Sequence, residues 1–513
     1  MTTTGRFCGK SVAIDDTMVH AYLGMPFGES TAGSNRWAPP IPKAALPGTP
    51  RATQFGAVCP QPSLPADVPA ASEDCLSINA WMPAAATAQS KLPVMVFIYG
   101  GAFVTGASAF PVYDSAYLSA KQDVVVVTFN YRIGALGFLS GVGGLTGNYG
   151  FLDQQLALRW VRDNVANFGG DPGRVTIFGE SAGAMSVGLH LLSAPQSAGL
   201  FDAIIMESNP LALPYKNSAA AQPIGAQFAS LVGCRSGALD CLRQVSVAKV
   251  IEQETSVLLA QFILQQGFED LLVWAPIIDG TVITGEPLTA AREHGFSKPA
   301  LLGTNRDEGT LFVYGILNNL GLQTLNKSLY EVLLETLFGK QNVPAILMHY
   351  PSNNSDNAPT ASTLFTDYMF FCANRAAAVG GNDTVYAYTF NQVSHFNFAG
   401  IPQCVGEVCH VDELPYVFHS ATNIMQTFTA AEEMLSQNMV EYWANFSSAG
   451  HTPNASESTL PNWPAFPGKH YLVLASPITT VVDPPHNCDF WDSVGYLITP
   501  TMAPTPTPTP TPR

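Results

Sequence analysis

The stretch GESAGA, from Gly179 to Ala184, places a serine between two glycines in the spacing Gly-x-Ser-x-Gly. It follows the apolar run RVTIF and precedes MSVGLHLL, so the pattern predicts a strand, a tight turn and a helix. In such a turn the glycines permit close backbone packing, the serine is raised out of the strand, and the amide of Ala182 points at a reacting carbonyl. An ordinary turn of small residues is the alternative, because the motif fixes few positions. Ser181 is therefore a candidate nucleophile for acyl transfer.

A serine nucleophile needs a base, an acid that orients the base, and donors for the developing oxyanion. The Gly-rich stretch IYGGAF follows an apolar run, and its amides at Gly101 and Ala102 are candidate oxyanion donors together with that of Ala182. A glycine pair after a strand is equally typical of a plain turn. Ten histidines compete for the role of base. Residue types alone leave the base and the acid open.

The composition is that of a folded chain with a large core. The 513 residues are 47% hydrophobic and only 12% charged, with a formal net charge of -16. This balance excludes a disordered chain and disfavours nucleic acid and anionic membranes as partners. No uninterrupted apolar stretch reaches the roughly 18 residues of a membrane span. The first residues, MTTTGRFCGK, show no signal-peptide pattern.

The cysteines and the asparagine motifs indicate an oxidising, extracellular setting. The nine cysteines include pairs that flank short loops, a spacing unlike that of zinc ligands. Buried thiols of a cytosolic enzyme are the alternative. Asn-x-Ser/Thr motifs, which are glycosylation acceptors in secreted proteins, occur at Asn326, Asn353, Asn382, Asn445 and Asn454. We therefore expect a protein that is secreted or displayed on the cell surface.

The order of apolar runs predicts an α/β fold. Runs such as VMVFIYG, DVVVVTFN, RVTIFG, DAIIME, PALLGT and VYAYTF are rich in Val and Ile and alternate in part with helical patterns. This alternation is typical of a mostly parallel sheet that is buried on both faces. The stretches 214–268 and 311–371 look helical and are expected to wall the site. We predict one domain over 1–498 and an extended Pro/Thr-rich tail, a linker or disordered end, over 499–513.

Several motifs together resemble the type-B carboxylesterases, the cholinesterase-like branch of the α/β-hydrolases. They are YLGMPFG and SEDCLSINAWMP near the start, then IYGGAF, NYRIGALGFL, the long GNYGFLDQQLALRWVRDNVANFGGDPGRVTIFGESAGA, and finally LLGTNRDEGTLF and HVDELPYVF. They occur in the order of the family and cover most of the chain. The resemblance implies an α/β-hydrolase fold and serine carboxylic-ester hydrolysis.

The resemblance also implies a catalytic triad. Ser181 is the implied nucleophile, Glu308 of RDEG the acid and His410 of CHVDELPYVF the base. The order serine, acid, histidine is that of α/β-hydrolases. Asp307 is the rival acid, since either neighbouring carboxylate can hydrogen-bond an imidazole. Glu180 would add negative charge beside the nucleophile, and Ser208 matches a serine near the triad.

The family contexts further imply disulfides. The implied pairs are Cys59 with Cys75, Cys234 with Cys241, and Cys372 with Cys488. A bridge between Cys404 and Cys409 departs from the general pattern and would stiffen the loop that carries the candidate base. Cys8 is left over. Arg36 with Glu73 and Arg132 with Asp153 match ion pairs that support this fold.

The implied reaction is acyl transfer through an acyl-serine intermediate, with no metal or cofactor. The partner is a small-molecule ester, and the oligomeric state stays open. In cholinesterases the loop corresponding to 59–75 carries a tryptophan that binds the quaternary ammonium, but here the loop has no aromatic residue, so a choline ester is disfavoured. The loop is also too short for a lipase lid. We expect soluble esters with short to medium acyl groups.

Leu272 and Trp274 of LLVWAPIIDG align with the acyl-pocket wall of the family, where an indole would limit the length of the acyl group. The alternative is that Trp274 belongs to the core behind that wall, since tryptophan is commonly buried. Two other functions remain open. One is a lipase acting on longer-chain esters, and the other is a non-catalytic adhesion protein of the same fold, although such proteins typically lose the nucleophile.

Overall fold

The structure, a computed structural model, describes residues 1–513 except 236, 264–266, 382–383, 449, 455–458 and 499–513. A single sheet of 11 strands runs through the molecule in the order β1-β2-β3-β5-β4-β6-β7-β8-β9-β10-β11. The strands are β1 Lys10–Ile14, β2 Thr17–Pro26, β3 Ser77–Pro83, β4 Leu92–Ile98, β5 Val125–Phe129, β6 Gly170–Glu180, β7 Ala203–Glu207, β8 Ala300–Asn305, β9 Val385–Phe390, β10 His470–Leu474 and β11 Thr479–Val482.

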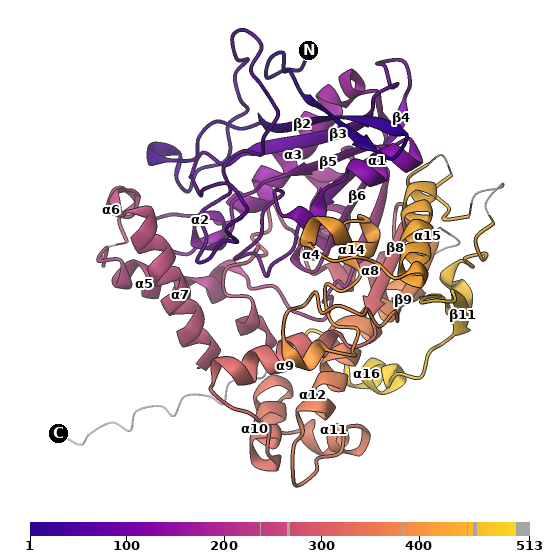
Figure 1. The fold of residues 1–513 in the computed structure, drawn as a ribbon. Coiled ribbons are helices and arrows are strands. Elements are labelled where there is room, and N and C mark those ends of the chain that lie inside the picture. The colour runs from indigo at the N-terminus through magenta and orange to yellow at the C-terminus, as the bar shows by residue number, and fades with distance from the viewer. Residues whose placement is uncertain (236, 264–266, 382–383, 449, 455–458, 499–513) are drawn as a thin grey trace.

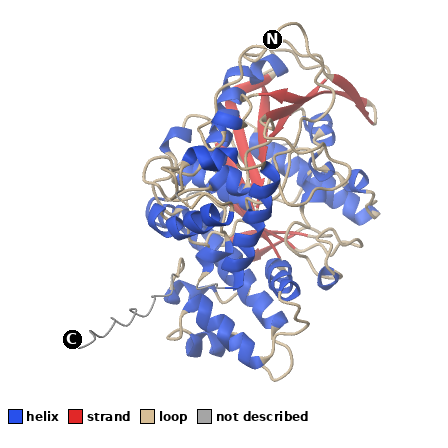
Figure 2. Cartoon of the chain, turned by 90° about the vertical axis from the view of Figure 1, so that its left-hand side faces the viewer, coloured by secondary structure: helices blue, strands red, loops and turns tan. Residues whose placement is uncertain are grey.

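The centre of the sheet is parallel. Strands β5, β4, β6, β7, β8, β9 and β10 pair in parallel with one another in this order. The six apolar runs noted in the sequence form β4 to β9, and every residue of β5, β7, β8 and β9 is buried. Such strands have apolar side chains on both faces because helices cover both faces, as Figure 2 shows. The predicted α/β fold with a mostly parallel sheet is confirmed.

The edges of the sheet are antiparallel. Strands β1, β2 and β3 pair antiparallel with one another, β3 also pairs antiparallel with β5, and β11 pairs antiparallel with β10 at the other edge. Strand β2 alternates buried and partly exposed residues, which fits a strand with one face toward solvent. These edge strands complete the sheet on each side of the parallel centre.

The helices surround this sheet and fill the two long insertions. The stretch 214–268 contains α5, α6 and α7, and the stretch 311–371 contains α9 to α12 with a π-helical turn at Thr366–Phe371, so both helical predictions are confirmed. In Figure 1, α10, α11 and α12 gather at the lower end of the molecule and α5, α6 and α7 on its left. The helices are α1 Ala116–Gln122, α2 Gly134–Phe138, α3 Tyr149–Asn164, α4 Ala182–Leu192, α5 Ser218–Leu231, α6 Leu239–Gln244, α7 Val247–Ile263, α8 Pro287–His294, α9 Glu308–Asn319, α10 Lys327–Phe338, α11 Val343–His349, α12 Ala358–Phe365, α13 Cys372–Val379, α14 Leu414–Val417, α15 Ala430–Ser447 and α16 Cys488–Val494.

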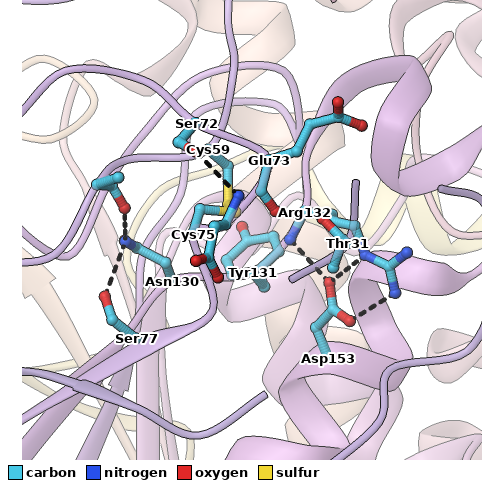
Figure 3. Close-up of a disulfide and its surroundings, with 12 residues drawn as sticks. Thr31, Cys59, Ser72, Glu73, Cys75, Ser77, Asn130, Tyr131, Arg132 and Asp153 are labelled. Carbon is cyan, nitrogen blue, oxygen red and sulfur yellow. Dashed lines mark hydrogen bonds and ion pairs between the residues drawn. A yellow bond between two sulfur atoms is a disulfide. The ribbon is translucent and has the colours of Figure 1, made fainter. Parts of the chain in front are cut away.

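Covalent and ionic cross-links fasten the loops to the sheet. The disulfides are Cys59–Cys75, Cys234–Cys241, Cys372–Cys488 and Cys404–Cys409, and Cys8 is an exposed free thiol. Arg36 binds Glu73 through two hydrogen bonds, and the buried Arg132 binds Asp153 in the same manner. Figure 3 shows the Arg132 guanidinium directed at Asp153 in the neighbourhood of the Cys59–Cys75 bridge. No helix among the described residues is long and apolar enough to cross a membrane.

Candidate active site

Ser181 lies at the sharp turn between β6 and α4. Its backbone has φ 56 and ψ -122, a strained conformation for a residue with a side chain. Its amide donates to the carbonyl of Glu207 on the neighbouring β7, at 3.0 Å. A Cβ atom added at Gly183 would lie 1.9 Å from the Ile98 carbonyl oxygen, so only glycine lets α4 pack this closely on β4. The turn leaves Ser181 partly exposed between buried neighbours.

The candidate oxyanion donors lie against this turn. Gly100 is so close that a Cβ atom there would lie 3.0 Å from the Cβ of Ser181. The next two residues have positive φ angles, 111 at Gly101 and 52 at Ala102, which turn the backbone sharply after β4. Ala182 is the first residue of α4, so its amide has no carbonyl partner within the helix. The segment after β4 and the first residue of α4 therefore both lie beside the serine.

His410 and Glu308 form a buried pair. The Nδ1 atom of His410 lies 2.5 Å from Oε2 of Glu308, the first residue of α9. The other carboxylate oxygen accepts the amide of Asn305 at 2.7 Å, which fixes the orientation of the acid. Both side chains are almost completely buried. A carboxylate at Nδ1 holds the proton there and leaves Nε2 as the basic nitrogen.

The Nε2 atom of His410 faces the nucleophile turn. It lies 3.0 Å from Oε1 of Glu180, without the geometry of a hydrogen bond, and has no hydrogen-bond partner among the described residues. The rings of Phe312 and Phe370 pack on the imidazole, with centroid distances of 4.9 and 5.3 Å. These rings exclude water from its faces and restrict its orientation.

The electrostatics favour a protonated imidazole. Burial alone lowers the pKa of His410, but the carboxylates of Glu180 and Glu308 more than offset this, so the pKa is raised. Burial raises the pKa of Glu180 to about 7, against the lowering effect of His410 and with a further rise from Glu308. A positive imidazolium is thus stabilised between two carboxyl groups, which is the state the base must reach in acyl transfer.

Asp307, the rival acid in the sequence, has a different partner. Its amide donates to the carbonyl of Val408 at 2.9 Å, and its Oδ2 accepts the amide of Val408 at 2.8 Å. It also pairs with the neighbouring Arg306. The carboxylate therefore binds the loop that precedes His410, while Glu308 binds the imidazole.

Two further buried glutamates lie beside the pair and were missed in the sequence. Glu413 accepts from the side-chain amide of Asn305 at 2.5 Å and from the Ser208 hydroxyl at 3.4 Å. Glu207 accepts from the indole of Trp443 at 2.6 Å, and burial raises its pKa to about 8. Ser208 was expected near the triad, and it contacts this set. A glutamate three residues after His410 was the signal that could have revealed the first of them.

The expected acyl-pocket residues occupy different environments. Trp274 is 1% exposed, packs edge-to-face on Phe228 of α5, and donates its indole N–H to the carbonyl of Glu254. This is the core position that the alternative interpretation describes. Leu272 is only partly buried, and its carbonyl accepts from the Lys216 ammonium at 3.2 Å. Of the two, only Leu272 has a surface left for a substrate.

Fold and site together define an α/β-hydrolase with the groups of a serine esterase. A model of the Carboxylesterase family matches residues 1–491, and the chain belongs to this family. The chain is 34% identical to a cholinesterase of Mus musculus, over 96% of this chain and 85% of that protein, and 34% identical to an acylcarnitine hydrolase of Mus musculus, over 92% and 86%. The solved structure of a thermophilic PNB esterase superimposes with a TM-score of 0.80 at 30% identity, covering 94% of this chain and 97% of that one. The protein is a serine carboxylic-ester hydrolase.

Proposed function

We propose that Ser181, His410 and Glu308 are the catalytic triad and that the enzyme hydrolyses soluble esters with short to medium acyl groups. The observation that carries the proposal is the 2.5 Å contact between His410 and Glu308, which lies next to the strained serine turn. The amides of Gly101, Ala102 and Ala182 complete the arrangement as the oxyanion hole. The proposal is supported by Gly101, Ser181 and Glu308, which closely follow the carboxyl ends of the parallel strands β4, β6 and β8, where α/β enzymes bind their ligands.

The proposed reaction has two acyl-transfer steps. His410 accepts the proton of Ser181 at Nε2 as the hydroxyl oxygen attacks the ester carbonyl, and the three amides bind the resulting oxyanion. The tetrahedral intermediate expels the alcohol, which takes the proton from the imidazolium, and leaves an acyl-serine. Water then gives a proton to His410 as it attacks the acyl carbon. The second tetrahedral intermediate breaks its bond to Ser181, whose oxygen takes the proton back from the imidazolium as the carboxylic acid is released. Glu308 keeps the imidazole in the required tautomer throughout.

The preference for short or medium acyl groups rests on two features. The loop between Cys59 and Cys75 is short, is tied by its disulfide and has no aromatic residue, so it offers little surface for a lipid chain or a quaternary ammonium. Leu272 is the proposed wall of the acyl pocket, and it packs on the main core, whereas Trp274 belongs to a separate apolar cluster. The proposed wall is thus a modest aliphatic side chain.

We propose that the enzyme is secreted or displayed on the cell surface, with residues 1–498 as the hydrolase domain and 499–513 as a Pro/Thr-rich tail or linker. Four disulfides support an oxidising compartment. Asn326 and Asn353 are exposed, and the Asn353 side-chain amide donates to the Asp356 carbonyl at 2.8 Å, so we expect more glycan at Asn326 than at Asn353. Asn445 and Asn454 are partly buried, and the Asn454 amide donates to the Trp463 carbonyl at 2.8 Å, so we expect little glycan at these two. Asn382 and the linker lie outside the described residues.

The test is hydrolysis of p-nitrophenyl esters from acetate to palmitate, below and above their solubility limits. We expect activity on dissolved acetate to octanoate, a decline toward palmitate, and a loss of at least about 10⁴-fold in Ser181→Ala. The partly exposed Ser256 of α7, whose hydroxyl donates to the Glu252 carbonyl of the same helix, gives the matched control, and Ser256→Ala should keep full activity. A rate that rises only above the solubility limit would instead identify a lipase. Equal rates for wild type and Ser181→Ala would refute the proposed nucleophile.

A further inference from the structure

The turn that carries His410 has an unfavourable backbone. Residues 409–412 form a tight turn, closed by a hydrogen bond from the Asp412 amide to the Cys409 carbonyl at 3.2 Å. His410 and Val411 occupy its two corners. Val411 has φ 77, in the left-handed region that glycine adopts freely and that a β-branched residue strongly disfavours. The turn that presents His410 therefore stores strain.

The Asp412 side chain closes the same turn a second time. Its Oδ2 accepts the Cys409 amide at 2.7 Å, and the residue is only 5% exposed, so water does not compete for this bond. Two contacts from outside also hold the turn. The Cys409 carbonyl accepts from the side-chain amide of Asn305 at 2.8 Å, and the Cys409 sulfur is bonded to that of Cys404. Among these contacts, the bond between the Asp412 carboxylate and the Cys409 amide connects the two ends of the turn on either side of His410.

We propose that Asp412 is a positioning residue that holds the strained 409–412 turn closed and so keeps the His410 imidazole against Glu308. The proposal rests on the proposed function, in which His410 is the base. Without the side-chain bond, the strain at Val411 is relieved by opening the turn. The imidazole then moves away from its 2.5 Å contact with the acid.

Geometry has to be separated from charge. The charged groups that act on Asp412 are Glu308 and His410, and burial raises the pKa of the Asp412 carboxyl to about 7. A purely electrostatic role would therefore also change His410. Asp412→Asn removes the charge but keeps an oxygen that can accept the Cys409 amide. Asp412→Ala removes both, and Val411→Gly removes the strain that the bond opposes.

The experiment compares Asp412→Ala, Asp412→Asn and the double variant Val411→Gly/Asp412→Ala. We expect kcat for p-nitrophenyl acetate to fall at least about tenfold in Asp412→Ala with KM unchanged, because small displacements of a catalytic group are costly. Asp412→Asn should stay within about twofold of wild type with the same pH profile, and the double variant should recover most of the loss. The matched control is Asp202→Ala, since the Asp202 carboxylate also accepts a backbone amide, that of Val175 in the middle of β6, at 3.0 Å.

A second readout does not need substrate turnover. The low-field proton NMR signal of the His410 Nδ1–H, assigned by its absence in His410→Gln, reports the contact with Glu308 directly. It should be lost or broadened in Asp412→Ala and present in Asp412→Asn and the double variant. If the wild type hydrolyses no ester, the proposed function fails, and this signal alone decides the role of Asp412.

Each contrary result is distinct. An unchanged kcat and an unchanged NMR signal in Asp412→Ala would overturn the proposal. An equal loss in Asp412→Asn with a shifted pH profile would assign the effect to charge, which also overturns it. If Asp412→Ala does not fold, Val411→Gly/Asp412→Ala decides: an active double variant supports the proposal, and an inactive or unfolded one contradicts it.

Discussion

The serine turn and the histidine turn solve the same backbone problem in opposite ways. At each, a residue with a side chain adopts a positive φ, 56 at Ser181 and 77 at Val411. Around Ser181, glycines remove side chains so that α4 packs directly on the β4 backbone. Around Val411, side chains are added instead: a disulfide, the Asp412 carboxylate and the Asn305 amide tie the turn in place. The serine turn is thus held by close backbone packing, and the histidine turn is held by tethers, that is, by the disulfide and the side-chain hydrogen bonds.

The difference predicts whether a substitution at each turn reduces stability or catalysis. Close packing of backbone on backbone contributes to the core, so damage to the serine turn should unfold the protein. Tethers on a loop contribute less to the core, so damage to the histidine turn should reduce catalysis before it reduces stability. The variants below test this division.

The largest effect is expected from Gly183→Ala. The added Cβ would meet the Ile98 carbonyl oxygen at 1.9 Å, and neither backbone can give way without separating α4 from β4. We expect a loss of more than about 5 kcal/mol in unfolding free energy, measured by urea denaturation. Gly315→Ala in α9 is the control, because nothing lies within 4 Å of the added atom; it should gain about 0.5 to 1 kcal/mol. Equal midpoints for Gly183→Ala and wild type would contradict the packing argument.

The next effect compares two disulfides. Cys372–Cys488 spans 116 residues and Cys404–Cys409 spans 5, so the chain-entropy argument assigns about 5 and about 2 kcal/mol to them. Replacing Cys372 and Cys488 by serine should therefore lower the urea midpoint more, with kcat unchanged in the folded protein. Replacing Cys404 and Cys409 should lower kcat by about tenfold with the smaller loss of stability. If kcat falls in proportion to the loss of unfolding free energy in both variants, the Cys404–Cys409 disulfide has no catalytic role of its own.

The smallest effect concerns the charge that the serine turn places beside the histidine. The Glu180 carboxylate helps to raise the pKa of His410, and the base must be neutral to accept a proton. In Glu180→Gln the imidazole should lose its proton at lower pH, so the acid limb of kcat/KM should move down by about 1 pH unit. The measurement is p-nitrophenyl acetate hydrolysis from pH 4.5 to 8, with Glu252→Gln on α7 as the remote control. An acid limb of kcat/KM that stays in place or moves to higher pH would show that Glu180 does not raise the pKa of His410.

The sequence predicted the parts of the molecule that depend on neighbouring residues. The Val and Ile runs of β4 to β9 are recognisable because burial on both faces requires continuous apolar residues. The serine turn is recognisable because Gly179 and Gly183 flank Ser181 closely in the sequence. The resemblance to the esterases supplied Glu308 and His410, which spacing alone did not distinguish from other acids and histidines.

The remaining features depend on contacts between distant segments. The Asp307 carboxylate binds Val408, and Asn305 binds Cys409, across about a hundred residues of intervening chain. No local pattern shows that Val411 adopts a left-handed conformation, or that the Trp274 indole turns into the core. Strands β1, β10 and β11 have only 5, 5 and 4 residues, so their periodicity is weak, whereas β2 alternates buried and partly exposed residues over 10.

The parallel centre of the sheet also bears on how such an enzyme diversifies. Ser181 follows β6, Glu308 follows β8, and His410 reaches the same edge after β9. The strands fix these three points, whereas segments such as 59–75 and 391–409 lie outside the strands. Loop grafting between relatives can therefore exchange the walls of the binding site while the reactive groups stay in register. The scaffold is in this sense evolvable: new specificities can arise by recombining loops without redesigning the chemistry.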